Sequence, residues 1–347
     1  MIRLGVVGCN FGRAVLLPAF RADPRCKVAA LAGTDIARTT EIAQAEGIAR
    51  PFADWRDLTD DPHLDAVAIA VPPSLQPDIA IRALKAGKAV FAEKPLASTL
   101  AAAQAVHEQA KASGRPVMID FEFGELPAWQ RAKALIDDGT LGSLRHVVVG
   151  WQVENYATRM RLKSWKTDGA DGGGALGNFV SHCFHYLENF CGPIRDLSAN
   201  IFHLPGAAAA SESSVSLSGT FQSGAAYMLS MSAASYLGSG HRIEFYGEDG
   251  TLVLRNTTAD YMRGFELLHA RRPAAALTQI EVTDPDEARY PDGRITPISR
   301  LAKRFLDAIE TGSPVSPGIE HGLRVQKLIH LARESQLNGS KRIVIEQ

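Results

Sequence analysis

The chain is poor in cysteine and has no excess of charge of either sign. Its four cysteines are spread over 347 residues, and none forms a C-x-x-C pair or a zinc-ribbon spacing. This scarcity excludes a disulfide-stapled domain and favours a reduced, cytoplasmic protein. Lysine and arginine number 37 against 38 aspartate and glutamate residues, which gives a net charge of −1. Such a balance gives no sign of a nucleic-acid or membrane partner.

Long apolar runs are missing as well. The opening residues, MIRLGVVGCN, hold fewer consecutive apolar residues than a signal peptide needs. No stretch approaches the ~20 apolar residues of a membrane-spanning helix. At ~150 residues per domain the length predicts two domains. A chain of this size buries a core without help from disulfides or metal ions.

The N-terminal third alternates between short apolar segments and helical patterns. Strands are predicted at 2–7, 27–32, 66–71, 89–92 and 117–121, and helices at 12–21, 36–47, 78–86 and 98–113. Pro18 is expected to kink or restart the first helix, and Ser98 to cap the last one, which ends before Gly114. Apolar strands that alternate with helices indicate a parallel sheet covered on both faces, with ligands at the carboxyl ends of its strands. The candidate ligand loops begin at Gly8, Gly33, Pro72 and Glu93.

The remainder of the chain has a different pattern. A helix is predicted at 127–138, and period-2 alternation at 214–221 and around a turn at Asp249-Gly250 predicts antiparallel strands. Helices return at 298–311 and 323–336. We therefore expect an α/β protein with a doubly wound parallel sheet in residues 1–121. A second α/β domain in residues 122–347 should contain a large open, mostly antiparallel sheet.

A glycine turn follows the first strand. It reads Gly8-Cys9-Asn10-Phe11-Gly12, one residue shorter than the dinucleotide fingerprint and without its middle glycine. A strand, a glycine turn and a helix start still direct helix N-terminal amides at a pyrophosphate. Gly8, Asn10, Phe11 and Gly12 are therefore candidate cofactor-binding residues. The alternative is a tight turn that binds nothing.

The residues after the second strand bear on the choice of cofactor. Gly33 stands where an acidic residue would hold the ribose hydroxyls of NAD. Thr34 and Arg38 can receive the 2′-phosphate of NADP, one by its hydroxyl and the other by its charge. Asp35 favours NAD if it reaches the ribose, or it caps the next helix. The pattern favours NADP over NAD.

The fourth strand ends in Glu93-Lys94-Pro95, which places two charged residues at the ligand edge of the sheet. With this motif the chain resembles the Gfo/Idh/MocA family of glucose–fructose oxidoreductase and inositol dehydrogenase relatives. The stretches that carry the resemblance are Leu4–Gly8 with Gly12-Arg13, Ala70–Pro73, Ala86–Leu96, Gly172–Leu176 with His182, and Phe305–Ile309 with Gly312.

The resemblance implies a Rossmann domain followed by an α/β domain with an open sheet, whose last helices pack back toward the N-terminal domain. It implies a catalytic lysine at Lys94, often with a cis peptide at the next proline. It also implies that the loop with Pro72, Pro73 and Gln76 lines the nicotinamide, with Glu93 close by. Gln76 stands where many members of the family carry histidine.

Asn178, His182 and His185 follow a glycine run and are spaced for one helix face. By resemblance, His182 is the acid/base residue, while Asn178 and His185 replace two aspartates of the family. Asparagine can orient a neighbour but brings no charge. The alternative for His182 is a histidine of the core. With Cys183 these histidines form no typical metal site, and no metal is expected.

Tyr156, Trp165 and Lys166 precede the glycine run and suit a polyhydroxylated or anionic small molecule, unless they form a solvated loop. His185 is a further candidate substrate residue. The resemblance implies an NAD(P)-dependent dehydrogenase or reductase that moves hydride between nicotinamide and a hydroxyl- or carbonyl-bearing carbon of a sugar or cyclitol. Two alternatives are an enzyme that recycles a tightly bound NAD within each turnover, and a non-catalytic cofactor sensor. A homodimer or homotetramer is expected, because the open sheet leaves a face to be covered.

Overall fold

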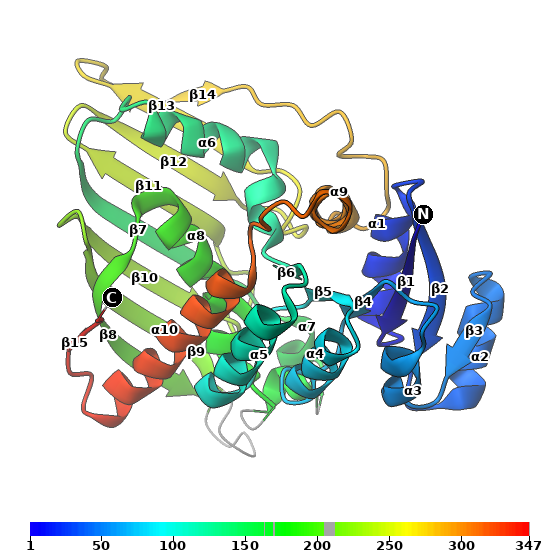
Figure 1. The fold of residues 1–347 in the computed structure, drawn as a ribbon. Coiled ribbons are helices and arrows are strands. Elements are labelled where there is room, and N and C mark those ends of the chain that lie inside the picture. Colours follow the sequence, from blue (N-terminus) through cyan, green and yellow to red (C-terminus); the bar gives the residue numbers. More distant parts are fainter. Residues whose placement is uncertain (163, 169–170, 205–211, 347) are drawn as a thin grey trace. The chain divides into compact units, whose positions relative to one another are not determined.

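The computed structural model describes all residues except 163, 169–170, 205–211 and 347 (Figure 1). The chain divides into two compact units. Unit 1 comprises Met1–Glu122 and Arg289–Gln326, and unit 2 comprises Phe123–Ala288 and Lys327–Gln347. Among the described residues, no helix is both long enough and apolar enough to cross a membrane.

Unit 1 is built on a six-stranded sheet in which every neighbouring pair is parallel. The strands are β1 (Ile2–Val7), β2 (Cys26–Ala32), β3 (Arg50–Phe52), β4 (Ala66–Ile69), β5 (Ala89–Ala92) and β6 (Val117–Ile119). Their order is β3-β2-β1-β4-β5-β6, which confirms the doubly wound parallel sheet. The strand order reverses between β1 and β4, so the carboxyl ends of these two strands flank the place where such sheets bind ligands.

Unit 1 also contains helical segments. They are a π-helical turn (Gly12–Leu16), α1 (Leu17–Arg21), α2 (Ile36–Ala45), α3 (Trp55–Asp60), α4 (Gln76–Lys85), α5 (Leu100–Ser113) and α9 (Ile295–Thr311). Pro18 lies in the first turn of α1 and restarts the helix there, because a first-turn residue needs no amide donor. The predicted cap of α5 was wrong by one residue: Thr99, rather than Ser98, accepts the Ala102 amide at 3.2 Å. Gly114 ends α5 in the left-handed conformation, as expected.

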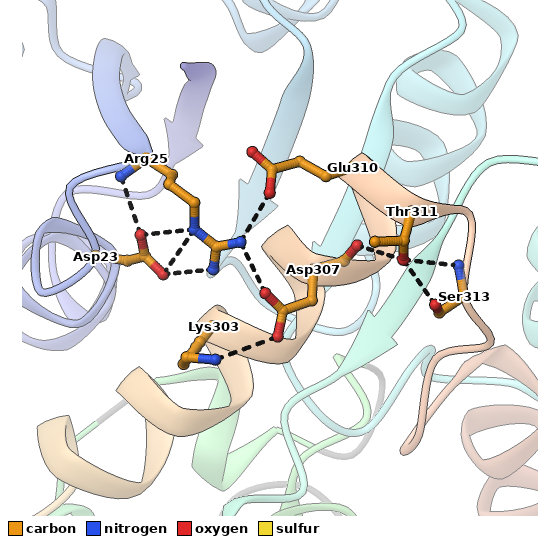
Figure 2. A network of polar contacts seen from close by, with 7 residues as sticks. All are labelled: Asp23, Arg25, Lys303, Asp307, Glu310, Thr311 and Ser313. Atoms are coloured by element: carbon orange, nitrogen blue, oxygen red, sulfur yellow. Dashed lines mark hydrogen bonds and ion pairs between the residues drawn. The ribbon is translucent and has the colours of Figure 1, made fainter.

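Helix α9 belongs to the core of unit 1. Phe305 lies edge-on to Phe20 and Phe91, with ring centroids 6.2 and 5.8 Å away. At the edge of this contact, Arg25 forms ion pairs with Asp307 at 2.7 Å and with Glu310 at 2.8 Å (Figure 2). The aromatic rings bury apolar area while the ion pairs stay near solvent, so packing provides most of the attachment of α9.

Unit 2 contains a nine-stranded sheet of order β14-β13-β12-β11-β7-β10-β9-β8-β15. Its strands are β7 (Leu144–Gln152), β8 (Ile194–His203), β9 (Glu212–Phe221), β10 (Ala226–Ser232), β11 (Gly240–Gly247), β12 (Gly250–Asn256), β13 (Glu266–Arg271), β14 (Thr278–Ile280) and β15 (Ile343–Val344). Only the pair of β7 and β10 is parallel among these described strands, which confirms a mostly antiparallel sheet.

One face of this sheet is buried and the other is open. Along β10, Tyr227, Leu229 and Met231 are buried, while Met228 and Ser230 point to the exposed face. The helices of unit 2 are α6 (Pro127–Asp137), α7 (Tyr156–Arg159), a π-helical turn (Leu176–Val180), α8 (Ser181–Cys191) and the later part of α10 (Ile319–Leu337). Helices α6 and α8 lie on the buried face (Figure 1), where ring contacts join Trp129, Phe190 and Phe245.

Candidate active site

The glycine turn after β1 lies at the switch point of the six-stranded sheet. Gly8 has a φ of +115°, and a Cβ on it would collide with the Ala70 carbonyl, so only glycine lets β1 and β4 approach here. Gly12 then begins the helical segment, and a Cβ on it would lie 2.9 Å from Val6. Close packing therefore specifies both glycines. The turn leads into a helix N-terminus, which is a favourable site for a phosphate.

Asn10 and Phe11 stabilise this turn through their side chains. Arg38 Nη2 donates to Asn10 Oδ1 at 2.9 Å, which ties the turn to the first turn of α2. Phe11 packs against the core of unit 1, and the Arg294 guanidinium lies 5.1 Å from its ring centroid. The turn is thus braced from both the α2 side and the segment that precedes α9.

The end of β2 has no room for an acidic side chain at Gly33. A Cβ there would lie 2.5 Å from both Cys9 Sγ and Thr39 Oγ1. Thr34 is exposed. Asp35 is the N-cap of α2, and its carboxylate accepts the amide three residues further on at 3.1 Å. The capping alternative for Asp35 is therefore the one that the structure shows.

Gln76 braces the Glu-Lys-Pro segment. Its side chain is 1% exposed, and Nε2 lies 2.6, 3.1 and 3.2 Å from the carbonyl oxygens of Glu93, Pro95 and Leu96. The Lys94–Pro95 peptide bond between these acceptors is cis. One buried amide therefore holds the backbone on both sides of Lys94.

Pro72 and Pro73 lie in the loop from β4 to α4. The Pro72 carbonyl accepts the amides of Leu75 and Gln76 at 3.0 and 3.2 Å, so the loop closes directly into the first turn of α4. Helix α4 begins at Gln76, two residues before the predicted start, because Pro77 fits a first helical turn. The loop thereby fixes the position of the Gln76 amide.

Two acidic residues that we did not predict lie near Lys94. Asp120 and Glu122 directly follow β6 and are 1% and 6% exposed. Burial raises the pKa of Asp120 well above its usual range, and Glu93 and Glu122 raise it further, whereas Lys94 lowers it. Burial raises the pKa of Glu122 to about 7 against an opposing effect of Lys94. The signal that could have found them is their place directly after a buried strand, at the ligand edge of the sheet.

In unit 2 the glycine run packs against the Trp165–Thr167 turn. A Cβ on Gly173 would collide with the Trp165 carbonyl, and the Gly173 amide donates to the Asp168 carbonyl at 2.9 Å. Trp165 is partly exposed and Lys166 is exposed, with Lys166 Nζ 5.7 Å from the Trp165 ring centroid. Two of the predicted substrate residues are thus held beside the glycine run. The third, Tyr156, is 61% exposed on α7.

Asn178, His182 and His185 differ in their surroundings. Asn178 lies in the π-helical turn and His182 in α8, so the regular four-residue spacing does not continue between them. His182 is 6% exposed, and its ring stands edge-on to Phe123 with centroids 5.1 Å apart. His185 instead lines a cavity of about 290 Å³ between α6 and α8, together with Lys133 and other residues of both helices.

An uncharged layer lies behind His182. Trp151, whose ring centroid is 6.3 Å from that of His182, stacks on His241 at 4.1 Å with an interplanar angle of 4°. The Tyr186 hydroxyl lies 3.0 Å from both His241 Nε2 and Cys183 Sγ. Burial lowers the pKa of His241 to about 3 and raises that of Cys183 to about 12. At neutral pH this layer therefore carries no charge.

No cluster of three or more histidine, cysteine, aspartate or glutamate side chains in the described part of the chain is arranged to hold a metal ion. The chemistry available is that of an ammonium among carboxyl groups in unit 1 and of an imidazole among aromatic rings in unit 2.

Comparison with known proteins agrees with this organisation. Residues 2–121 match the model of the oxidoreductase family with an NAD-binding Rossmann fold, and residues 129–253 match the GFO/IDH/MocA C-terminal domain. The chain belongs to the Gfo/Idh/MocA oxidoreductase family. An uncharacterized oxidoreductase of Synechocystis sp. is 31% identical over 352 residues, which cover 96% of this chain and 94% of that protein.

Levoglucosan dehydrogenase offers a second comparison. The enzyme of Pseudarthrobacter phenanthrenivorans is 30% identical over 209 residues, covering 57% of this chain and 53% of that protein. A solved structure titled as levoglucosan dehydrogenase in complex with NADH and levoglucosan has a TM-score of 0.89 at 23% identity, with both chains covered completely. That similarity shows the fold.

The residues at the switch point fit the dinucleotide of an NAD-binding oxidoreductase. The turn at Gly8 and Gly12 precedes a helix N-terminus, and the strand order reverses beside it. Gly8, Asn10 and Gly12 would hold the pyrophosphate end. The nicotinamide supplies hydride chemistry when it is bound, while the protein provides orientation and charge.

Proposed function

We propose that the protein oxidises or reduces one carbon of a sugar, a cyclitol or a related polyhydroxylated molecule, with Lys94, His182 and Asn178 as the reacting and positioning groups. The observation that supports this proposal most directly is the position of Lys94. It follows a buried strand at the ligand edge of the parallel sheet, and the Gln76 amide holds its backbone on both sides. A lysine braced in this way is suited to hold a substrate oxygen.

In the direction of oxidation, the Lys94 ammonium donates a hydrogen bond to the substrate oxygen and stabilises the negative charge that develops there. His182 accepts the hydroxyl proton as a general base. Asn178 orients the substrate or the His182 ring through its amide. Pro72, Pro73 and Glu93 line the reactive end of the cofactor, on the loops that follow β4 and β5.

The substrate class is supported by two observations. Trp165 and Lys166 hold an aromatic ring and an ammonium beside the glycine run that leads to Asn178 and His182, and Tyr156 adds an exposed ring. Rings and charged donors of this kind suit the faces and hydroxyls of a sugar. The comparison with levoglucosan dehydrogenase points to the same class. His185, the fourth candidate substrate residue, lines the cavity between α6 and α8.

For the cofactor we propose a preference for NADP over NAD. Cys9 and Thr39 fill the space that an acidic side chain at position 33 would need, and Asp35 is engaged in capping α2. Thr34 and Arg38 are exposed and adjacent to the turn. Arg38→Ala should weaken NADP(H) binding while sparing NAD(H), as measured by calorimetry. Equal or tighter binding of NAD(H) by the unmodified protein would contradict the preference.

The experiment that tests the function is a panel of sugars, cyclitols and their keto forms, assayed with both cofactors by the absorbance of the reduced nicotinamide. Net formation or loss of reduced cofactor with at least one polyol or its ketone is expected. Substrate conversion without net change, together with cofactor that survives purification, would instead indicate an enzyme that recycles its NAD within each turnover. Binding without any conversion would indicate a sensor.

We also propose a homodimer or homotetramer formed through the open face of the nine-stranded sheet. Met228 on β10 is 56% exposed and Tyr246 on β11 is 36% exposed on that face, and Arg242 and Glu244 lie on the same strand as Tyr246. Light scattering at micromolar concentration should give a multiple of the chain mass, and a monomer mass would contradict the proposal. The free cysteines support the cytoplasm as the compartment.

A further inference from the structure

Two carboxyl groups meet where β5 and β6 end. The strands pair in parallel with Ala92 opposite Ile119, so the next residues, Glu93 and Asp120, leave the sheet side by side. The Asp120 amide donates to the Ala92 carbonyl at 2.9 Å, which extends the pairing to the very end of β5. The backbone thus fixes these two acidic residues as neighbours.

The Asp120 carboxyl group and one oxygen of Glu93 are buried, while Glu93 Oε2 accepts the Lys94 amide at 3.3 Å. Asp120 is 1% exposed, and neither of its oxygens has a hydrogen-bond donor among the described residues; the same holds for Glu93 Oε1. The two side chains face each other closely enough to hydrogen-bond once one of them is protonated. Two ionised carboxylates offer only acceptors, and their repulsion is strong away from water. The arrangement is therefore stable when the pair shares one proton.

The other charged groups around Asp120 act in opposite directions on its ionisation. Glu93 and Glu122 oppose its ionisation, and Lys94 is the cation that favours it. Arg294 acts on Glu122 in the same sense as Lys94 does. Burial is the largest contribution, and the pKa of Asp120 lies well above its usual range. The proton on the pair therefore persists at a pH where exposed aspartates are ionised.

We propose that Asp120 is a positioning residue for Lys94: Asp120 and Glu93 share one proton, and its loss draws the Lys94 ammonium toward the carboxylates and away from the substrate oxygen, which lowers turnover. No substrate bond is involved, and the proton leaves to bulk solvent. The effect on turnover rests on the proposed function, in which Lys94 holds that oxygen. The inference of a shared proton does not depend on the proposed function, because it is drawn from the positions of Asp120 and Glu93 alone.

The first experiment observes the proton without catalysis. Infrared difference spectra of the unmodified protein, recorded across a pH series, should show a protonated carboxyl C=O band at neutral pH that disappears as the pH rises. Asp120→Asn should remove this band, whereas Asp61→Asn should leave it. Asp61 is a matched control, because it is also a buried acid of unit 1, paired with Arg50 and distant in sequence from β5 and β6. Absence of an Asp120-dependent band at neutral pH would overturn the shared proton.

The second experiment follows turnover against pH on a substrate found by the panel. The unmodified protein should lose about tenfold in kcat over the pH interval in which the infrared band disappears, as the pair loses its proton. Asp120→Asn keeps a hydrogen on this side chain, so its loss should be less than about twofold over the same interval. Glu93→Gln leaves Asp120 as the one ionisable member of the pair, so the pair never carries more than the single negative charge of its active state, and the decline should be absent there as well.

Loss of the pH-dependent decline in both amide variants separates positioning from a structural role, because a damaged fold would lower kcat at every pH without flattening its profile. Unfolding midpoints of the variants establish that each is folded. A decline that persists in Asp120→Asn or in Glu93→Gln would overturn the role of the pair. If Lys94→Ala retained normal turnover, the proposed function would fail, while the infrared band would still report on the shared proton.

Discussion

Lys94 and His182 are held by contrasting surroundings. In unit 1, Lys94 lies among carboxyl groups, and two of those, on Asp120 and Glu122, are almost completely buried. In unit 2, His182 lies against aromatic rings, and the layer behind it consists of an imidazole, a phenol and a thiol that burial keeps uncharged. One region contains several charges that depend on each other, and the other contains almost none.

The contrast shows two ways to prepare a group for proton and hydride chemistry. A buried charge is tolerated only when other charges or donors compensate it, so the position of Lys94 should depend on the protonation of the buried carboxyl groups near it. A neutral ring needs no counter-charge and is held by shape and stacking alone. Variants in unit 1 should therefore respond strongly to pH, while packing should dominate the response in unit 2.

The largest effect is expected at Lys94. Lys94→Ala should lower turnover by about 100-fold or more, because it removes a positioned donor to the substrate oxygen. Cofactor affinity should change little, since the pyrophosphate end is held by the Gly8 and Gly12 turn. Steady-state kinetics and calorimetry measure the two quantities.

Lys88→Met is the matched control for Lys94→Ala. Lys88 is also a lysine of unit 1 and is 3% exposed, but it precedes β5 rather than following it. Turnover of Lys88→Met should remain within about twofold of that of the unmodified protein. This change is small compared with the loss of turnover expected when one positioned donor is removed. Equal losses in the two variants would show that buried lysines support the fold and that Lys94 has no special part in the reaction.

A smaller loss is expected at His182. His182→Ala should lower turnover by about tenfold, less than the roughly 100-fold that a general base contributes at the low end, with most of the binding retained. The loss should grow as the pH rises, because only the neutral ring can accept a proton. His146→Ala, on the open face of the sheet, is the control and should leave the pH profile unchanged. A loss that does not depend on pH would assign His182 to the core instead.

The sequence was sufficient for features that depend on local pattern. The apolar strands, the period-2 alternation of β9 and the helix end at Gly114 follow from spacing and from one glycine. The Glu-Lys-Pro motif indicated that Lys94 is a functional residue, because two charged residues directly after a buried strand are unusual. Strand β3 and helix α3 were missed, because β3 has three residues and α3 is mainly polar.

The features that the sequence did not reveal depend on contacts between distant residues. Asp120 was taken as part of a strand that in fact ends at Ile119, so its pairing with Glu93 across two strand ends went unnoticed. Trp151 and His241 lie on neighbouring strands, and only their register brings the rings into a stack. The π-helical turn before α8 likewise interrupts the four-residue helical spacing that we expected between Asn178 and His182.

A third prediction concerns the effect of the buried Glu122 carboxyl group on the free energy of unfolding. The folded-state pKa of Glu122 is raised to about 7, so the native protein binds more protons than the unfolded chain between that value and the ordinary pKa of glutamate. Stability should therefore decline as the pH rises through this interval. Glu122→Gln should raise the free energy of unfolding by about 1–3 kcal/mol above about pH 7, and by nothing measurable near about pH 4. Urea unfolding at a series of pH values measures this, with the exposed Glu41→Gln as control.

The smallest effect is expected where charge is exposed. Arg25 is 32% exposed, and its partners Asp307 and Glu310 are 40% and 41% exposed, so solvent screens the network that Figure 2 shows. Arg25→Gln should lower the free energy of unfolding by no more than about 1 kcal/mol, and less in high salt.

Hydrogen bonds and charge from Arg25 lower the pKa of Asp23 and Asp307, so this contribution is present above the ordinary pKa of aspartate and disappears as the pH falls through the lowered values. The pH trend is thus opposite in sign to that of Glu122. A loss of several kcal/mol that salt did not reduce would show that the network, rather than the packing of Phe305, attaches α9.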